Sequence, residues 1–577
     1  MTPQQAVIGA ALIVLVVLLV RGRQAPALIF TGVAFVFVLL GYVTLPQVLK
    51  QFTNPGLVTV LALMLVSVVL DKSRLLEMLA TRLVRGSYRQ ALVKLIAATS
   101  LYSAVLNNTA VVASLIGPLR SNRAHSASRL LLPMCYAASI GGILTLVGTS
   151  TNLLVNTFMI GNGMAPLHLF DLLPVGLPIL LACSVTIVLT FPWLMKPRAN
   201  DEPPAVDYFV EAHVLPTSSM VGRSVEENAL RHLGHLFLSE IVRDGRLIAP
   251  VSPDEAIEAD DRLVFAGDVK RLDLLARFDG LQIEGRRAGL SMHNLVEVIV
   301  TVNSPIARRT LREVDFRSQF DAAVVAVRRG DQRLSGGIGS IRLEVGDTLV
   351  LTAGSDFDKR NSRSRNFIVV SRPEVAKFVD PFRGLASLAG FLGVIVLAAL
   401  GWIDFLEGLL VLLAVFLMFG FTKVDELRRH VPYNLVFVIG SALVISEVML
   451  KSGTADIIAS AVLAVFAPLG PEGALASILL LTWVLTELMT NNAAAALAFP
   501  VAIGVAQRLG MDPMPFVMAV IYGASASFLT PYGYQTNLMV MAPGRYTLGD
   551  YLRCGAPVAL AFLGTALLAI PIFFPLR

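Results

Sequence analysis

Long apolar runs occupy both ends of the chain, and a polar segment of mixed charge separates them. The apolar parts extend from residue 1 to about 196 and from about 384 to the last residue. Several runs exceed the roughly 18 apolar residues that are typical of a membrane-spanning helix. The pattern predicts an all-α polytopic membrane protein, divided by an α+β insert that is long enough for two small domains.

The amino-acid composition also indicates a membrane protein. Hydrophobic residues make up 55% of the chain and charged residues 15%, and the mean hydropathy is +0.71. A soluble domain carries about 25% charged residues. The net charge of +6 is modest, and basic loops on the inner side of a membrane explain it better than a nucleic-acid partner. We therefore expect an integral, multi-pass protein of a bacterial inner or plasma membrane, with the lipid bilayer as its surroundings.

The basic residues also predict a topology. Every basic cluster falls on one side of the membrane if the run at 91–119 enters and leaves on the same side. That run would then be a re-entrant hairpin with its tip near Asn107 and Asn108. The insert would be cytoplasmic. The first apolar run lacks a basic start and a small-residue cleavage site, which favours a first span over a signal peptide.

The second apolar part repeats the first. Three landmarks recur in the same order at nearly constant spacing: Asn107 and Asn491 (384 residues apart), Asn152 and Asn537 (385), and Asp171 and Asp550 (379). The two halves start from opposite sides of the membrane, so the repeats are inverted, with membrane domains at 1–196 and 381–577 and a second hairpin at about 473–505. Inverted repeats with broken helices are typical of secondary transporters.

The insert contains a repeat of its own, with a period of about 85 residues. We expect two small domains, at 205–285 and 286–370. Each is predicted to run as a strand, a helix opened by Ser or Thr, two strands joined by a DG or RG turn, and a final apolar strand. Neither contains a phosphate-binding loop followed by a helix.

The hairpin tips and the helix breaks contain the candidate chemistry. A helix that restarts after paired amides offers free N–H groups and a positive dipole end to an anion. The carbonyl ends and amide oxygens suit a monovalent cation such as Na⁺. Two further stretches, GTSTN at 148–152 and TPYGYQTN at 530–537, supply glycines for a break and then hydroxyls and an amide. The alternative for any single Asn or Thr at such a place is a hydrogen bond that joins two helices, with no ligand involved.

These clusters have no carboxylate, cysteine or histidine. Their composition argues against a transition-metal site and against acid–base or nucleophilic catalysis, so we expect no enzyme activity and no cofactor. Glu487, one helical turn before Asn491, is a candidate for proton coupling or an end-of-helix residue. Glu447 is also a candidate for proton coupling, but a place at the end of its span or a local pair with Lys451 is favoured for it. Asp171 and Asp550 are expected to cap the last helix of each repeat.

At NNTAVV, GTSTNL and LTPYGYQTNLMV the sequence resembles the divalent-anion:sodium symporters, which include sodium/sulfate and sodium/dicarboxylate carriers of the ion-transporter superfamily. The resemblance covers both membrane halves. It implies a homodimer that works as an elevator, with two hairpins and two broken helices. The insert domains look like the C-terminal ligand-sensing domains of potassium-uptake regulators. That likeness implies regulation by a small ligand, with a nucleotide as one candidate.

The same resemblance implies roles for individual residues. One sodium site would contain Asn108 and Gly148, and the other Thr490, Asn492 and Gly533. The anion is assigned to the neighbouring amides and hydroxyls: Asn107, Thr109, Thr151, Asn152, Asn491, Thr536 and Asn537.

The predicted function is sodium-coupled symport of a small divalent anion, with sulfate favoured because the relatives that carry such an insert look most like sulfate permeases. Dicarboxylate symport and a proton-coupled or arsenite-type antiporter are the alternatives in the same superfamily. A ligand-regulated ion channel and a receptor with a transporter fold are rivals from other classes. The inverted halves and the absence of a filter such as TVGYG argue against the channel.

Overall fold

The computed structural model covers all 577 residues. It describes the chain except for residues 1, 22–23, 71–82, 123, 196–208, 231–235, 244–245, 249–250, 268–277, 285–294, 302–303, 305, 315, 330–331, 335–337, 354–356, 358–359, 361–366, 372–380 and 467–469. Part of the basic run at 72–89, the predicted DG turn at 244–245 and the glycine of the predicted RG turn at 330 lie outside the described residues.

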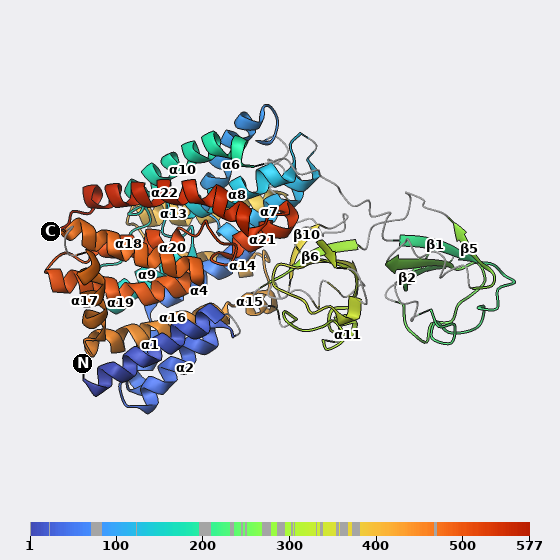
Figure 1. Ribbon diagram of the computed structural model, residues 1–577, viewed down its shortest axis with the longest axis horizontal. Coiled ribbons are helices and arrows are strands. Elements are labelled where there is room, and N and C mark those ends of the chain that lie inside the picture. The colour runs from blue at the N-terminus through green and yellow to red at the C-terminus, as the bar shows by residue number, and fades with distance from the viewer. Residues whose placement is uncertain are drawn as a thin grey trace. The chain divides into compact units, whose positions relative to one another are not determined.

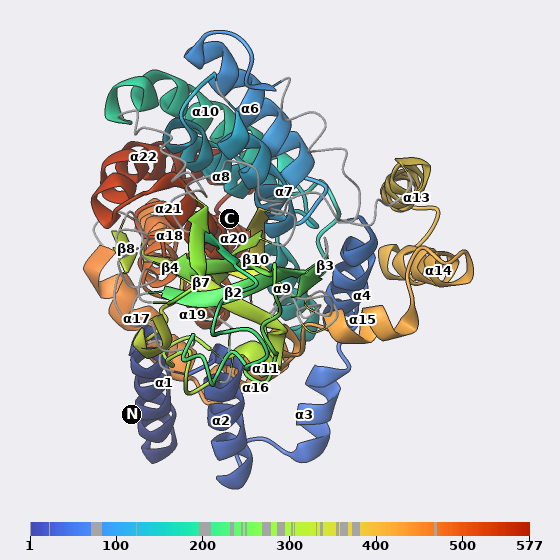
Figure 2. The ribbon, with the colours of Figure 1, turned by 90° about the vertical axis from the view of Figure 1, so that its right-hand side faces the viewer.

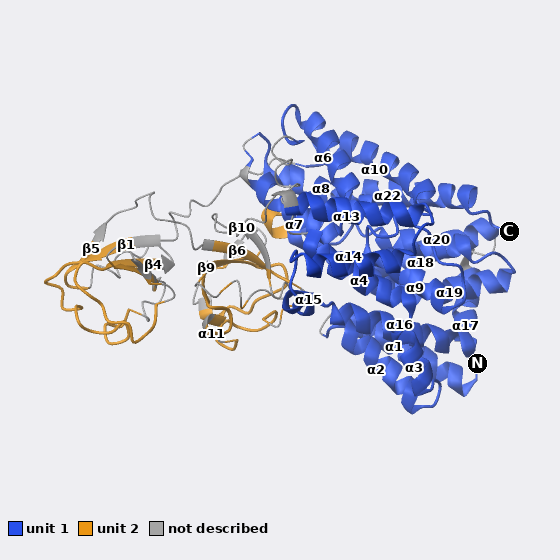
Figure 3. Cartoon of the chain, turned by 180° about the vertical axis from the view of Figure 1, so that it is seen from behind, with its two compact units in different colours: residues 1–197, 379–540, 546–577 blue, residues 198–378, 541–545 orange. Residues whose placement is uncertain are grey.

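The chain forms two compact units (Figure 3). Unit 1 is helical and combines residues 1–197, 379–540 and 546–577. Unit 2 contains residues 198–378 together with 541–545. The apolar ends of the chain thus come together in one body, and the polar segment between them is inserted into it, as the sequence predicts.

The first half of unit 1 contains nine described helices. They are α1 (Pro3–Arg21), α2 (Pro26–Leu39), α3 (Leu45–Phe52), α4 (Pro55–Leu70), α6 (Tyr88–Ser103), α7 (Asn108–Ser121), α8 (Ala127–Gly142), α9 (Ser150–Gly161) and α10 (Leu173–Leu194).

The second half repeats this order. Its helices are α13 (Pro381–Ala399), α14 (Phe405–Met418), α15 (Val424–His430), α16 (Tyr433–Lys451), α17 (Thr454–Phe466), α18 (Gly470–Leu488), α19 (Asn491–Leu509), α20 (Met514–Ser525), α21 (Gln535–Gly544) and α22 (Leu548–Phe573). The partner of α17 in the first half would fall at 71–82, outside the described residues.

Helices of the first half pack on helices of the second half, and these contacts are reciprocal. Helix α2 packs on α16, and its counterpart α14 packs on α4; Figure 2 shows α13 and α14 beside α4. The last helices of the two repeats, α10 and α22, pack along each other (Figure 1). Reciprocal contacts of this kind are expected for two halves related by a twofold rotation, as in the inverted repeats that the sequence predicts.

Both hairpins and both broken helices are present. The helix stops between α6 and α7 at 104–107 and between α18 and α19 at 489–490. It stops again between α8 and α9 at 143–149 and between α20 and α21 at 526–534. Within the described residues, seven helices are long and apolar enough to cross a membrane. The predicted polytopic helical architecture is confirmed.

The pairing of the two amide motifs differs from the prediction by one residue. Helix α7 begins at Asn108 with Asn107 as its N-cap, whereas α19 begins at Asn491 with Thr490 as its N-cap. Asn108 therefore corresponds to Asn491, and pairing Asn107 with Asn491 was wrong. Adjacent identical amides leave this register open in the sequence, because Asn and Thr both serve as N-caps.

The insert contains two five-stranded antiparallel sheets with the same strand order, β3-β2-β4-β1-β5 and β8-β7-β9-β6-β10. The strands of the first are β1 (Phe209–Val214), β2 (Leu236–Arg243), β3 (Arg246–Ile248), β4 (Arg262–Gly267) and β5 (Leu281–Glu284). Those of the second are β6 (Leu295–Val300), β7 (Ala322–Arg329), β8 (Gln332–Leu334), β9 (Thr348–Ala353) and β10 (Phe367–Ser371).

Two details of the insert differ from the prediction. A fifth strand, β5 or β10, pairs with the first strand of each sheet and was missed. The helix expected after Ser224 is a series of turns at 225–230, and the rest of it lies outside the described residues. The segment after Thr310 has turns at 311–314 and then the short helix α11 (Phe316–Phe320). Both starts nevertheless carry helix-like caps: the Ser224 N–H donates to Glu227 at 2.7 Å, and the Thr310 N–H donates to Glu313 at 2.9 Å.

Candidate functional site

The first polar cluster consists of Ser103, Asn108, Gly142 and Gly148, and joins the first hairpin tip to the α8–α9 break. The Ser103 hydroxyl donates to the backbone oxygen of Ala138 at 2.8 Å and contacts the Asn108 side chain. One arm of the Asn108 amide lies 3.1 Å from the backbone oxygen of Gly148 and 3.2 Å from that of Ala138. All neighbours are satisfied when this arm is the nitrogen, which donates to both carbonyls, and when the oxygen accepts from the Tyr534 hydroxyl. The carbonyl and hydroxyl oxygens that converge here, joined by the amide oxygen when the amide turns over, suit a hard monovalent cation.

Two glycines of this cluster allow backbone atoms to approach closely. A Cβ on Gly148 would lie 2.5 Å from the Gly142 backbone oxygen and 2.9 Å from that of Ser103. A Cβ on Gly142 would lie 2.5 Å from Oδ1 of Asn108. Each position therefore excludes a side chain, which keeps carbonyl oxygens pointed into the cluster.

The second polar cluster consists of Thr486, Asn491, Ser527 and Gly533, and joins the second hairpin tip to the α20–α21 break. The Thr486 hydroxyl lies 2.9 Å from Oδ1 of Asn491 and 2.7 Å from the backbone oxygen of Ala524. A Cβ on Gly533 would overlap Oγ of Ser527 and lie 2.5 Å from the Thr486 backbone oxygen. The arrangement repeats that of the first cluster, with Thr486, Asn491 and Gly533 in the places of Ser103, Asn108 and Gly148.

The second cluster also contains an oxygen without a partner. The Ser527 side chain is 1% exposed, and its hydroxyl has no hydrogen-bond partner among the described residues. The side chain of Thr536, a predicted anion ligand, is fully buried and lies beside the Cys135 thiol. A buried polar atom costs free energy unless it binds something, so the Ser527 hydroxyl is available to a ligand.

The buried side chains of Asn152 and Asn537 stabilise the two helix breaks with hydrogen bonds to the backbone. The Asn152 amide donates to the backbone oxygens of Gly142 at 3.1 Å and Thr145 at 2.9 Å. Asn537 makes the same pair of bonds across the second break, at 3.0 and 3.1 Å. Both side chains are fully buried. The N–H donors of both side chains are thus used to hold the helix breaks, and their assignment to the anion stays a prediction.

Side chains from opposite halves meet between the two clusters. Oδ1 of Asn492 accepts a hydrogen bond from the Thr151 hydroxyl at 3.0 Å, and Ser150 lies 3.4 Å away. Asn107 caps α7, because its Oδ1 accepts from the backbone N–H of Thr109 at 2.9 Å. Thr490, in the matching place before α19, is exposed and makes no side-chain cap bond.

Sequence reasoning missed Tyr534. Its hydroxyl lies 2.6 Å from the Asn108 amide and 3.5 Å from the Thr149 hydroxyl, so a side chain of the second half completes the first cluster. Tyr534 stands in the GYQTN stretch where the first half has Thr149. That mismatch between the repeats is the one signal in the sequence that could have singled it out.

The charged candidates within the helices are bound to other groups. The Glu487 carboxylate accepts hydrogen bonds from three backbone N–H groups at 528–530. Glu447 accepts from Gln51 at 2.9 Å and pairs with Lys451 at 2.5 Å, as expected. Asp550 accepts from the N–H of Thr547 at 2.7 Å and caps α22, as predicted.

Asp171 does not cap α10. It accepts from the N–H of His168 at 2.8 Å and closes the turn before that helix. Among the described residues, no group of three or more His, Cys, Asp or Glu side chains could hold a metal ion.

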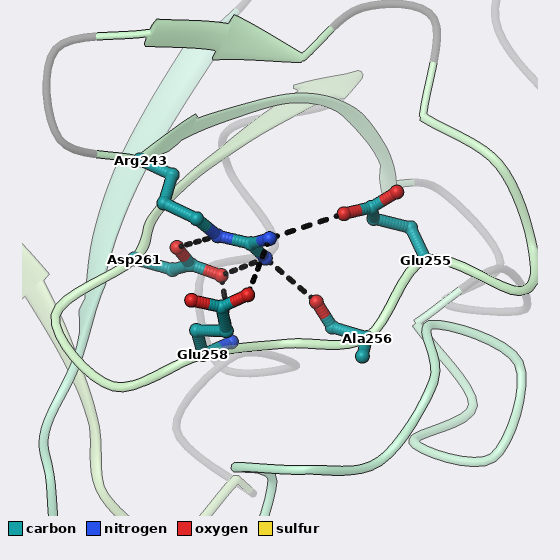
Figure 4. A network of polar contacts seen from close by, with 5 residues as sticks. All are labelled: Arg243, Glu255, Ala256, Glu258 and Asp261. Carbon is teal, nitrogen blue, oxygen red and sulfur yellow. Dashed lines mark hydrogen bonds and ion pairs between the residues drawn. The ribbon is translucent and has the colours of Figure 1, made fainter.

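Each sheet of the insert has one charged network, placed identically. Arg243 binds buried Asp261 with two hydrogen bonds of 2.9 Å and also reaches Glu255, Glu258 and the backbone oxygen of Ala256 (Figure 4). In the second sheet Arg329 does the same with Asp347, Glu344 and the backbone oxygen of Arg342. The hydrogen bond with Asp261 raises the pKa of the Arg243 guanidinium. Each network ties a strand end to the loop before the next long strand, and it recurs with the internal repeat of the insert.

Comparison with known proteins places the chain among transporters. A family model described as citrate transporter matches residues 13–520. A Chlamydomonas reinhardtii protein named as a candidate sulfur deprivation response regulator is 30% identical, with 96% of this chain and 98% of the relative covered. An uncharacterized transporter of Synechocystis is 29% identical over 94% of this chain and 92% of its own length.

Relatives with a named substrate match the chain over a smaller part. Sodium/sulfate cotransporter 1 of Chlamydomonas reinhardtii is 27% identical over 63% of this chain and 43% of its own length. It supports the expected resemblance to the divalent-anion:sodium symporters. The family match and the relatives together show that the chain belongs to the citrate transporter family, whose members are integral, multi-pass membrane transporters of anions and not enzymes.

Proposed function

We propose that the protein is a sodium-coupled symporter of a small divalent oxyanion, with sulfate as its substrate. The observation that carries the proposal is the pair of equivalent polar clusters, each placed where a hairpin tip meets a helix break. Both consist of neutral oxygen ligands from amides, hydroxyls and backbone carbonyls. Such ligands suit Na⁺ in a transporter.

The charge of the substrate supports sodium coupling. None of the side chains described in or between the two clusters is cationic. A dianion at this place would need counter-charge, because an uncompensated charge away from water is costly. Two Na⁺ ions beside it would supply that charge, while N–H groups at the starts of α7 and α19 would donate to its oxygens.

The structure changes which residues we assign to each ion. We keep Asn108 and Gly148, with Ser103, at the first sodium site. At the second site we keep Thr490 and Gly533 and add Thr486. We replace Asn492 by Asn491, because Asn491 occupies the place of Asn108. Asn492 then belongs to the anion, together with Thr109 and Thr151.

The remaining parts of the proposal rest on the resemblance. A homodimer would carry the hairpins across the membrane by an elevator movement, and the insert would regulate transport from the cytoplasm in response to a small ligand. The relatives named as sodium/sulfate cotransporters support sulfate. The description of the family model as citrate transporter favours a carboxylate, such as citrate, as the second candidate.

The test compares Asn491→Ala with Asn492→Ala in proteoliposomes. We expect Asn491→Ala to weaken the dependence of uptake on Na⁺ and Asn492→Ala to raise the KM for the anion. Asn108→Ala should behave like Asn491→Ala. Unchanged sodium dependence in both Asn108→Ala and Asn491→Ala would refute the sodium assignment.

A further inference from the structure

Glu487 contacts the second helix break more extensively than any other side chain described there. It lies in the last turn of α18, and its two carboxylate oxygens accept hydrogen bonds from the backbone N–H groups of Phe528, Leu529 and Thr530, each at 2.9 Å. The hydroxyl of Thr530 donates in return to the Glu487 backbone oxygen at 3.0 Å. One carboxylate therefore holds three consecutive residues of the 526–534 loop, and bonds of this charge-assisted kind are the stronger ones.

These contacts fix two walls of the second polar cluster at once. Thr486, which precedes Glu487, and Ser527, which precedes Phe528, both contribute an oxygen to that cluster. The same two residues crowd the Cα of Gly533. The Thr530 hydroxyl also accepts from the Gly533 N–H at 3.3 Å. The distance between α18 and the loop, and with it the spacing of the cluster's oxygens, thus depends on Glu487.

The first half has the same hydroxyl link without the carboxylate. The Thr145 hydroxyl donates to the backbone oxygen of Ala104 at 2.5 Å and accepts from the Gly148 N–H at 3.2 Å. Ala104 occupies the place of Glu487, so no side chain reaches the backbone N–H groups of that break from the same position. The two clusters therefore differ by one negative charge and by three hydrogen bonds.

We propose that Glu487 is a positioning residue that holds the 526–534 loop as one wall of the second sodium site and makes the two sodium sites unequal. This inference rests on the proposed sodium-coupled function. Glu487 acts through the loop and does not carry a proton, because its oxygens are engaged by backbone N–H groups. Its charge favours a cation in the adjacent cluster.

The test measures Na⁺ binding separately from transport. The full-length protein is purified in detergent, and its unfolding temperature is followed while Na⁺ replaces K⁺ at constant ionic strength. Wild type is compared with Glu487→Gln, which removes the charge and keeps the shape, and with Glu487→Asp, which keeps the charge. Glu447→Gln is the matched control, because Glu447, on α16, is paired with Lys451 of the same helix and with Gln51 of α3 and contributes to neither cluster.

We expect Glu487→Gln to raise the Na⁺ concentration for half-saturation by on the order of tenfold, as loss of one or two charge-assisted hydrogen bonds implies. Sulfate uptake should also show a lower Hill coefficient for Na⁺, because one of two sites is weakened. Glu487→Asp should restore part of the affinity, and Glu447→Gln should resemble wild type. A role in folding alone would lower the unfolding temperature in K⁺ without changing the Na⁺ response.

Several outcomes would overturn the inference, and they differ from failure of the proposed function. If wild type itself shows no response to Na⁺, the sodium-coupled function is wrong. If wild type responds and Glu487→Gln gives the same half-saturation, Glu487 is not a positioning residue. If Glu487→Gln abolishes uptake driven by a pH gradient and leaves Na⁺ affinity unchanged, Glu487 is a proton carrier. Should Glu487→Gln fail to fold, Glu487→Asp provides the test. Its shorter side chain should raise the Na⁺ concentration for half-saturation above that of wild type, and a wild-type value would overturn the inference.

Discussion

Replacement of Gly148 by alanine tests whether close backbone approach builds the first sodium site. The new Cβ would lie 2.5 Å from the Gly142 backbone oxygen, 2.8 Å from its Cα and 2.9 Å from the Ser103 backbone oxygen. All three neighbours are backbone atoms, so no side chain can rotate away. Restoring an ordinary contact of 3.4 Å would require a movement of about 1 Å between the α8–α9 break and the hairpin tip.

That movement has two measurable consequences. Overpacking of this kind costs about 1–3 kcal/mol, so the unfolding temperature in K⁺ should fall. A binding site displaced by about 1 Å loses its geometry, so Na⁺ should no longer raise the unfolding temperature through the first site. We expect sodium-driven sulfate uptake in proteoliposomes to fall at least tenfold.

The matched control is Gly564→Ala. A Cβ there would meet no atom within 4 Å, and the position lies inside α22. We expect wild-type uptake and equal or slightly higher stability, since alanine favours helix over glycine by about 1 kcal/mol. Wild-type sodium dependence in Gly148→Ala would refute the assignment of this cluster to Na⁺.

Three further predictions concern other described residues. Tyr534→Phe removes the hydroxyl that lies 2.6 Å from Asn108, and we expect weaker Na⁺ binding with little change in the unfolding temperature in K⁺. Arg243→Met leaves Asp261, whose side chain is 0% exposed, without its cation; hydrogen exchange of β2 and β4 should report a loss of about 3–5 kcal/mol, and unchanged protection would contradict the role of the network. Burial raises the pKa of Glu240 above its ordinary value, so its contribution to stability is present at acid pH and is lost as pH rises through the raised pKa. Glu240→Gln should therefore slow exchange of the β2 amides relative to wild type at pH 7 and lose this advantage near pH 4. Exchange equal to that of wild type at both pH values would refute the effect of burial.

The hairpins and helix breaks could be predicted from the sequence because paired amides and glycines interrupt runs that are otherwise apolar. The sequence also showed that the halves repeat. It could not fix the register of the amide motifs, since Asn107–Asn108 and Asn491–Asn492 each offer two adjacent amides. Hydrogen bonds made by Ser103 and Thr486 settle that register, and these depend on tertiary packing.

Contacts between distant segments were also beyond the sequence. Tyr534 reaches Asn108 across 426 residues, and no local pattern predicts such a pair. Glu487 was singled out as a charged residue near the hairpin tip, but its three N–H partners lie in a loop whose path only the fold determines. The strands β5 and β10, which pair at a sheet edge, were also missed.

Uptake of radiolabelled sulfate into proteoliposomes, with and without an inward Na⁺ gradient, tests sodium-coupled oxyanion transport most directly. Unlabelled succinate and citrate serve as competitors, and a K⁺ gradient of equal size is the control. We predict accumulation of sulfate above its external concentration only when the Na⁺ gradient is present, with little competition by either carboxylate. Accumulation driven by a pH gradient alone, or no accumulation of any of the three anions, would contradict the account.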